Sequence, residues 1–289
     1  MSTSVIHEEL IKYFREYIIV GGMPAAVNNW TQEQSLTSVN RIHHNLLATY
    51  RDDFAKYRNK LDSMRLEETM MAIPRMIGTK FVYKTVNPKI LTRNTKQALD
   101  LLTKARIASA VYSASGNGVP IGSEIRQKFF KTLFVDTGLC NASLGMTLND
   151  IKDAIDLVLV HEGGVAEQIC GQMLRTALPP YIEPNLYYWQ RNHPKSNAEI
   201  DYLIQHGDKV IPIEVKAGST GSLKSLHLFM QRKKLKLAIR FNSEKPSITP
   251  ISIKDHSGVL IEYTILSLPL YLTAQVHRLI NDFLSKKSG

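Results

Sequence analysis

The sequence predicts a mixed α/β fold, in which a helical amino-terminal part precedes a carboxy-terminal part where helices and strands alternate. Apolar residues recur at helical spacing through residues 1–60, which favours helices there. Residues 199–216 contain two strand-like runs around a turn, the pattern of a β-hairpin. A helical pattern at 223–230 and a strand pattern at 236–241 follow. We therefore expect an α/β domain after the helical part.

The chain of 289 residues is long enough for more than one domain. Its first clear helix break is Gly21-Gly22-Met23-Pro24. We expect four regions: a helical region at 1–60, a winged-helix-like domain at 61–125, a connecting region at 126–160 and an α/β domain at 161–289.

The winged-helix interpretation depends on the order of patterns between residues 61 and 125. Gly116-Asn117-Gly118 supplies a turn between two short apolar runs, because glycine adopts positive φ angles without strain. The expected elements are a helix at 66–77, a strand at 81–85, a helix at 92–105 and a hairpin at 107–121.

The second of these helices begins with Arg93, Asn94, Lys96 and Gln97. In helix-turn-helix modules, the first residues of the second helix contact base edges in the major groove. These four residues are therefore candidate DNA contacts. Winged helices also serve as protein contacts or spacers between domains, and that alternative stays open.

The hairpin at 199–216 contains the main candidate site residues of the chain. If Gly207 and Asp208 form its turn, Asp201 lies opposite Glu214, and Lys216 shares their face because side chains alternate along a strand. This face is expected to be charged. The other face is expected to enter a core with Ile200, Tyr202, Ile204, Ile211, Ile213 and Val215.

Two opposed carboxylates repel each other, so Asp201 and Glu214 favour a cation between them. Mg²⁺ or Mn²⁺ prefers such oxygen ligands and can activate water for hydrolysis of a phosphodiester. Lys216 is placed to offset developing negative charge. The alternative is an ordinary hairpin with a solvated polar face and a Glu–Lys pair.

These residues resemble the PD-(D/E)xK nuclease superfamily, in which an Asp, a Glu-x-Lys and an upstream helical Glu bind metal and cut nucleic acid. Here the match is Asp201, Glu214 and Lys216, with Glu167 four residues after Gly163 as the helical acid. The resemblance implies a restriction-endonuclease-like α/β domain at 161–289. It also implies that Glu167, Asp201 and Glu214 bind Mg²⁺ or Mn²⁺, and that these three residues and Lys216 are catalytic.

The whole chain resembles the carboxy-terminal region of a prokaryotic family of AAA+ ATP-binding proteins, a domain of unknown function numbered 4143. The segments that carry the resemblance are 17–24, 47–57, 134–139 and 186–216. Those proteins begin with a P-loop ATPase module, whereas this sequence contains no G-x-x-x-x-G-K-[ST], the signature of that loop. ATPase activity is therefore not expected, and a separate ATPase subunit is a candidate partner.

The formal net charge is +10, from 36 Lys and Arg against 26 Asp and Glu. Such a charge favours an anionic partner, and nucleic acid, in particular DNA, is expected. Only Cys140 and Cys170 are present, without zinc-ligand spacing. No apolar run is long enough to span a membrane, so we expect a cytoplasmic protein that does not enter a membrane.

The leading hypothesis is a metal-dependent endodeoxyribonuclease. Its competitor is a non-catalytic DNA-binding or assembly module derived from an AAA+ family protein. A third hypothesis is a regulatory interaction domain of an ATPase machine.

Overall fold

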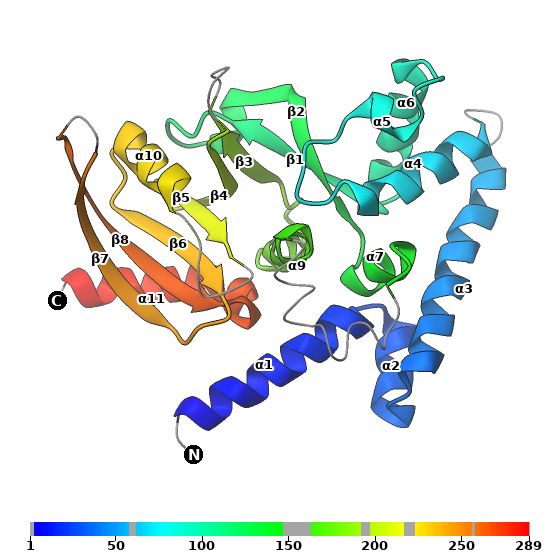
Figure 1. The fold of residues 1–289 in the computed structure, drawn as a ribbon, viewed down its shortest axis with the longest axis horizontal. Coiled ribbons are helices and arrows are strands. Elements are labelled where there is room, and N and C mark those ends of the chain that lie inside the picture. The colour runs from blue at the N-terminus through cyan, green and yellow to red at the C-terminus, as the bar shows by residue number, and fades with distance from the viewer. Residues whose placement is uncertain are drawn as a thin grey trace. The chain divides into compact units, whose positions relative to one another are not determined.

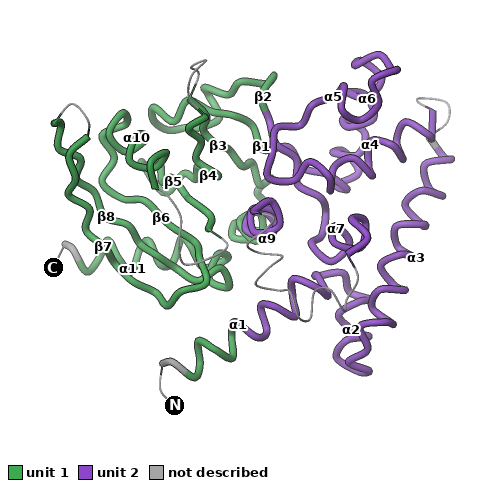
Figure 2. Tube along the Cα trace, in the orientation of Figure 1, with its two compact units in different colours: residues 1–11, 111–129, 173–289 green, residues 12–110, 130–172 purple. Residues whose placement is uncertain are grey.

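A computed structural model describes residues 3–57, 62–146, 163–191, 197–216, 223–255 and 258–288 (Figure 1). The chain divides into two compact units (Figure 2). Unit 1 contains residues 1–11, 111–129 and 173–289, and unit 2 contains residues 12–110 and 130–172.

The amino-terminal region is helical, as the sequence predicted. Its helices are α1 (Thr3–Val20), α2 (Pro24–Glu33) and α3 (Leu36–Phe54), followed by the short 3₁₀ helix η1 (Ala55–Tyr57). Pro24 begins α2, where its missing N–H and fixed φ suit the first helical turn. Ser35 caps α3 by accepting a hydrogen bond from the Ser38 N–H, so the breaks between helices follow from local sequence.

Two sequence segments that are far apart meet in unit 2. Asp136 is buried and accepts hydrogen bonds from the N–H of Gly22 at 2.7 Å and of Leu139 at 3.0 Å. Gly21 has a φ of 70°, and a Cβ there would lie 2.2 Å from Asp136 Oδ1. The carboxylate therefore fixes the turn between α1 and α2 while it caps α7 (Thr137–Ser143).

The region after α3 contains α4 (Ser63–Arg75), α5 (Tyr83–Val86) and α6 (Thr92–Lys104). The two predicted helices at 66–77 and 92–105 are confirmed, with small shifts of their ends. The predicted strand at 81–85 is wrong, because that segment leads into α5. Phe81 and Tyr83 pack against Phe130 there, with ring centroids 5.8 Å from it.

The described strands form one mixed sheet of eight strands in the order β2-β1-β3-β4-β5-β6-β8-β7. β4 is antiparallel to β3 and β5, whereas β5, β6 and β8 run parallel. Their bounds are Ala108–Ala114 for β1, Ile125–Phe134 for β2, Leu186–Gln190 for β3, Glu199–His206 for β4, Lys209–Val215 for β5, Leu237–Asn242 for β6, Ser247–Lys254 for β7 and Leu260–Pro269 for β8.

The predicted hairpin at 107–121 is only partly present. Its first strand is β1, which pairs in parallel with β3 within the large sheet. The return run is wrong as a strand, because residues 121–124 form the 3₁₀ helix η2 (Ile121–Glu124) and the next strand, β2, begins at Ile125. The expected connecting region contains most of β2 and all of α7, and its residues 147–160 lie outside the described residues.

The remaining helices include α9 (Gly163–Thr176), α10 (Lys224–Lys233), η3 (Leu270–Gln275) and α11 (Val276–Ser288). Within unit 1, α10 packs on the sheet through Leu226, Phe229 and Met230. This core receives residues from six strands, which are Ala114, Trp189, Ile200, Leu203, Val210, Ala238, Ile261, Tyr263 and Ile265. α10 therefore buries the sheet face from which these side chains project.

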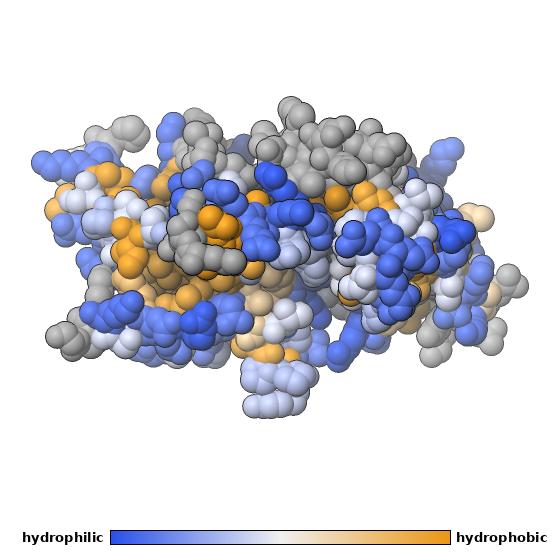
Figure 3. All heavy atoms as spheres, turned by 90° about the horizontal axis from the view of Figure 1, so that it is seen from below, coloured by the Kyte–Doolittle hydropathy of each residue, from blue (hydrophilic) through white to orange (hydrophobic). Residues whose placement is uncertain are grey.

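Within the described part of the chain, no helix has both the length and the apolar character needed to cross a membrane. On the face drawn in Figure 3, hydrophilic residues surround the apolar areas.

Candidate functional site

The predicted hairpin is confirmed. β4 and β5 are joined by a two-residue turn that begins at Gly207, whose φ is 59°, a conformation that glycine adopts without strain. Cross-strand pairs run from Tyr202 and Ile213 to His206 and Lys209. This is the register that the sequence predicted.

Asp201 lies in a β-bulge. Tyr187 of β3 pairs with Leu203, and Trp189 pairs with Ile200. The two pairs are therefore three residues apart on β4 but only two residues apart on β3. The extra residue explains why Ile200 and Leu203 both enter the core beneath α10 although they are three positions apart. Bulges bend a strand and redirect its side chains, and they are frequent beside active sites.

The Asp201 carboxylate is held against the backbone of β5. The Val215 N–H donates a hydrogen bond to Asp201 Oδ2 at 2.7 Å, so this side chain occupies the place of a β4 carbonyl oxygen. On the other side of β5, the Lys216 N–H donates to the Phe241 carbonyl oxygen of β6 at 2.8 Å. Asp201 is thereby fixed beside the segment Glu214-Val215-Lys216.

Glu214 is buried, with 4% of its surface exposed, and the Lys216 Nζ lies 2.6 Å from its Oε1. The prediction of a charged face is therefore only partly right. Side chains alternate along β5, so Glu214 shares a face with Val210. Val210 and Leu203 enter the core under α10, because that helix covers this face of the sheet. A buried carboxylate is rare unless it is paired or hydrogen-bonded. The solvated face of the alternative interpretation therefore does not describe Glu214, whereas its Glu–Lys pair is present.

Two residues from other strands add to the surroundings of Glu214. Arg240 of β6 is its partner in the parallel ladder. Burial raises the pKa of the Tyr263 hydroxyl on β8, and the negative charge of Glu214 raises it further. Tyr263 is hydrogen-bonded to His227 Nδ1 at 2.8 Å, and burial lowers the pKa of that histidine.

Glu167 belongs to unit 2, whereas Asp201, Glu214 and Lys216 belong to unit 1. Glu167 lies on α9, and its Oε2 is 2.7 Å from the Nζ of Lys131 on β2. Lys131 is only 3% exposed. Within unit 2, Glu167 therefore provides the counter-charge of a buried ammonium group, a role that its sequence context did not predict.

The donor chemistry of unit 1 suits a hard divalent cation. Asp201 and Glu214 offer carboxylate oxygens, and Mg²⁺ is commonly held by one or two carboxylates together with water and substrate phosphate. Across the described ranges, no three His, Cys, Asp or Glu side chains are grouped as a metal site. The two carboxylates fit Mg²⁺ or Mn²⁺ better than zinc, which prefers four nitrogen or sulfur ligands in structural sites.

The candidate DNA contacts lie on one face of α6. Arg93, Lys96 and Gln97 are exposed and Asn94 is half-buried. This exposure agrees with a contact surface, and DNA contact stays a prediction. The opposite face of the helix is buried and consists of Thr95, Ala98, Leu99 and Leu102.

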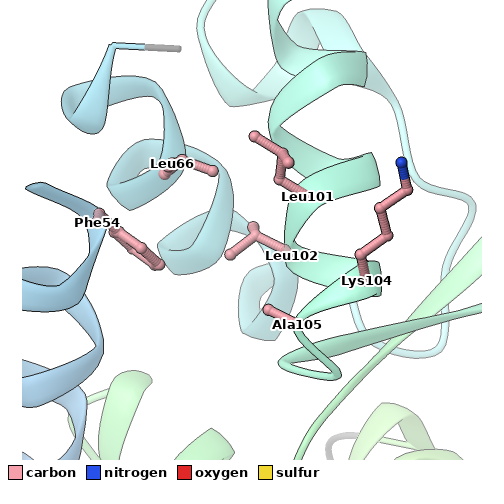
Figure 4. Close-up of a pocket in the computed structure, with 6 residues that line it drawn as sticks. All are labelled: Phe54, Leu66, Leu101, Leu102, Lys104 and Ala105. Atoms are coloured by element: carbon pink, nitrogen blue, oxygen red, sulfur yellow. The ribbon is translucent and has the colours of Figure 1, made fainter. Parts of the chain in front are cut away.

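Unit 2 also contains a pocket of about 250 Å³ between α4 and α6 (Figure 4). Leu66 and Leu102 face each other across it, and the Lys104 ammonium group points away from the other labelled side chains. Apart from Lys104, the described residues that line the pocket are apolar. Its lining consists of Phe54, Leu66, Leu101, Leu102, Lys104 and Ala105.

Sequence reasoning missed Arg240 and Tyr263 as neighbours of Glu214. No local signal identifies them, because each lies on a strand that is distant from the hairpin in the sequence. Only the parallel pairing of β5 with β6, and of β6 with β8, brings them near the hairpin.

Two family models match the chain. Residues 11–150 match one described as Domain of unknown function (DUF8612), and residues 162–255 match one described as Domain of unknown function (DUF4143). No curated protein matches the chain.

The resemblance to family 4143 is therefore confirmed for the part of the chain that contains Glu167 and the hairpin. Its extension over the full length is corrected, because the segments at 17–24, 47–57 and 134–139 fall within the match to the other family.

Proposed function

We propose that this protein is a metal-dependent nuclease that hydrolyses phosphodiester bonds in DNA. The observation that carries the proposal is the position of Asp201, whose carboxylate is fixed by a β-bulge and by the Val215 N–H beside Glu214 and Lys216. Two carboxylates and one ammonium group then share one end of a rigid hairpin. Such a donor set can hold a divalent cation at a phosphodiester.

Asp201 and Glu214 would hold the divalent cation. A bound Mg²⁺ or Mn²⁺ would supply Lewis acidity toward the phosphate and lower the pKa of water. Lys216 neutralises Glu214 at 2.6 Å, and in the complex it is placed to position the attacking water and offset charge on the phosphate. Glu167 stays a predicted third ligand, and the proposal does not depend on it.

The experiment compares wild type with Asp201→Asn on labelled single-stranded DNA, double-stranded DNA and RNA, with Mg²⁺, Mn²⁺ or EDTA. Asparagine keeps the size and one hydrogen-bond acceptor for the Val215 N–H but removes the charge. We expect metal-dependent cutting of DNA by wild type and a loss of roughly 100-fold or more in the variant, the effect of removing one charge-stabilising group from an active site.

The matched control is Asp208→Asn in the turn of the same hairpin, where the side chain is 86% exposed. It should cut like wild type. A wild type that cuts nothing with either metal, or an Asp201→Asn variant that cuts at the wild-type rate, would remove the proposal.

The second candidate is DNA binding without cleavage. It is favoured by the absence of a three-residue ligand group among the described residues. Under this function, wild type and Asp201→Asn bind DNA equally in EDTA, and neither cuts it when metal is added.

A further inference from the structure

A basic pocket of about 420 Å³ lies in unit 1, apart from the hairpin carboxylates. The segment after β1, the start of β2, the end of β3 and the end of α10 provide its walls. The residues that matter for its chemistry are Asn117, Arg126, Gln190, Arg232 and Lys233.

Three cations from two elements gather in this pocket. Burial lowers the pKa of Lys233, and the positive charges of Arg232 and Arg126 add to that lowering, whereas the nearby Glu124 opposes it. Lys233 donates a hydrogen bond to Asn117 Oδ1, and Asn117 donates to Glu124 at 2.8 Å. Among the described groups that these contacts bring together, Arg126, Arg232 and Lys233 outnumber the carboxylate of Glu124.

The carboxyl end of α10 alone does not account for this cluster. Basic residues in a last helical turn complement the helix dipole, which suits Arg232 and Lys233. Arg126 comes from β2, so the dipole of α10 does not account for it, and its charge adds to those of Arg232 and Lys233. The wall also contains Gln190, which is 8% exposed and whose Oε1 has no hydrogen-bond partner among the described residues. Because Oε1 only accepts hydrogen bonds, it does not bind a phosphate itself, and the cations are the anion-binding groups of this wall.

The pocket is close to the hairpin along the sheet. Gln190 pairs with Glu199, and Trp189 pairs with Ile200, so the pocket wall lies on the strand next to Asp201. Glu199 is two residues before Asp201, a distance of about 7 Å along a strand. A nucleic-acid backbone that reaches Asp201 can therefore place a neighbouring phosphate in the pocket.

We infer that Arg126, Arg232 and Lys233 bind a backbone phosphate of the nucleic acid whose cleavage is proposed above. Arginine suits this role because its planar guanidinium donates two parallel hydrogen bonds to phosphate oxygens. The inference rests on the proposed function for its substrate, and it concerns a site that is separate from the carboxylates.

The test is fluorescence anisotropy with a labelled DNA oligonucleotide in EDTA, at several salt concentrations. Arg126→Gln and Arg232→Gln should each weaken binding and lower the slope of log K against log salt by about 1, the change expected for one lost phosphate contact. Lys234→Gln is the matched control, because Lys234 is exposed at the same helix end and does not line the pocket. Its slope should match wild type.

Arg232 is exposed, so Arg232→Gln remains informative if Arg126→Gln does not fold. Pocket variants that bind like wild type, or that weaken binding no more than Lys234→Gln, would overturn the inference. Inorganic phosphate and a mononucleotide serve as competitors. Displacement of the oligonucleotide by either one at equal concentration would contradict recognition of a backbone.

Because the measurement contains no metal, it separates this inference from the proposed function. Reduced slopes for the pocket variants, with no cleavage by wild type, would support phosphate binding in the pocket and contradict the proposed nuclease function. Cleavage that depends on Asp201, with unchanged slopes, would support the nuclease function and contradict phosphate binding in the pocket.

Discussion

Glu214 shows at the level of one residue how the sequence and the fold each contribute to the candidate site. Alternation along the strand predicted that it shares a face with Lys216, and the ion pair at 2.6 Å agrees with that. Its burial was not predictable from the hairpin, because Leu226, Phe229 and Met230 of α10 cover that face.

Glu167 allows a direct test of a structural role. Glu167→Gln removes the carboxylate that lies 2.7 Å from the buried Lys131. Loss of one partner from a buried ion pair costs about 3 kcal/mol, so we expect a clear fall in the free energy of unfolding, measured by urea denaturation.

The control for this prediction is Glu33→Gln, an exposed position in α2 of the same unit, which should leave the stability unchanged. If the midpoint urea concentration of Glu167→Gln equals that of wild type, the ion pair with Lys131 does not contribute to the free energy of unfolding.

At the scale of elements, the turn between α1 and α2 offers a matched pair of variants. Gly21→Ala places a Cβ 2.2 Å from Asp136 Oδ1 at a φ of 70°. We expect it to destabilise the protein by about 1–3 kcal/mol, the cost of a strained left-handed residue. The melting temperature should fall accordingly.

Gly22→Ala is the control, because its nearest neighbour would be 3.7 Å from the added Cβ, an ordinary contact. Equal melting temperatures for the two variants would contradict the role assigned to Asp136.

β4 and α11 are connected by a pair of histidines. His206 Nε2 lies 2.9 Å from Asn281 Oδ1 and therefore donates, which leaves its Nδ1 to accept from His277 Nδ1 at 3.0 Å. Burial lowers the pKa of His277, and the adjacent His206 lowers it further. Protonation of His277 would place a positive charge on a partly buried ring beside His206.

The sign of the pH dependence follows from these contacts. A histidine whose pKa is lowered in the folded state contributes its full stability above its ordinary value of about 6.5 and loses it as the pH falls through the lowered value. We expect the stability of wild type to fall between about pH 7.5 and pH 5. Burial also lowers the pKa values of His43 and His227, so both add to this fall.

His277→Asn should make the fall shallower, because one titrating ring is removed. Urea denaturation across that pH range gives the measurement. A variant with the same pH dependence as wild type would exclude the histidine pair as a contributor.

The elements also show where sequence reasoning succeeds and fails. The turn at Gly207 and the register of β4 and β5 were predictable, because both depend on neighbouring residues. The strand predicted at 81–85 failed, because the packing of Phe81 and Tyr83 on Phe130 belongs to the tertiary structure. The bulge at Asp201 also needs β3 as a partner, so no pattern within β4 indicates it.

At the scale of the whole molecule, the net charge of +10 favours an anionic partner, but it does not say where that partner binds. Two groups of basic residues are candidates for that contact, one on the exposed face of α6 in unit 2 and one in the pocket of unit 1. Arg126 could not be assigned to the pocket from the sequence, because it is more than 100 positions from Arg232 and Lys233.

The central claim is that Asp201 and Glu214 support metal-dependent hydrolysis of DNA. Its most direct test is the rate of DNA cleavage by Asp201→Asn relative to Asp208→Asn at the same Mg²⁺ or Mn²⁺ concentration. We expect cutting by the turn variant, none in EDTA, and a rate roughly 100-fold or more lower for Asp201→Asn. Equal rates, or no cutting by wild type with either metal, would contradict it.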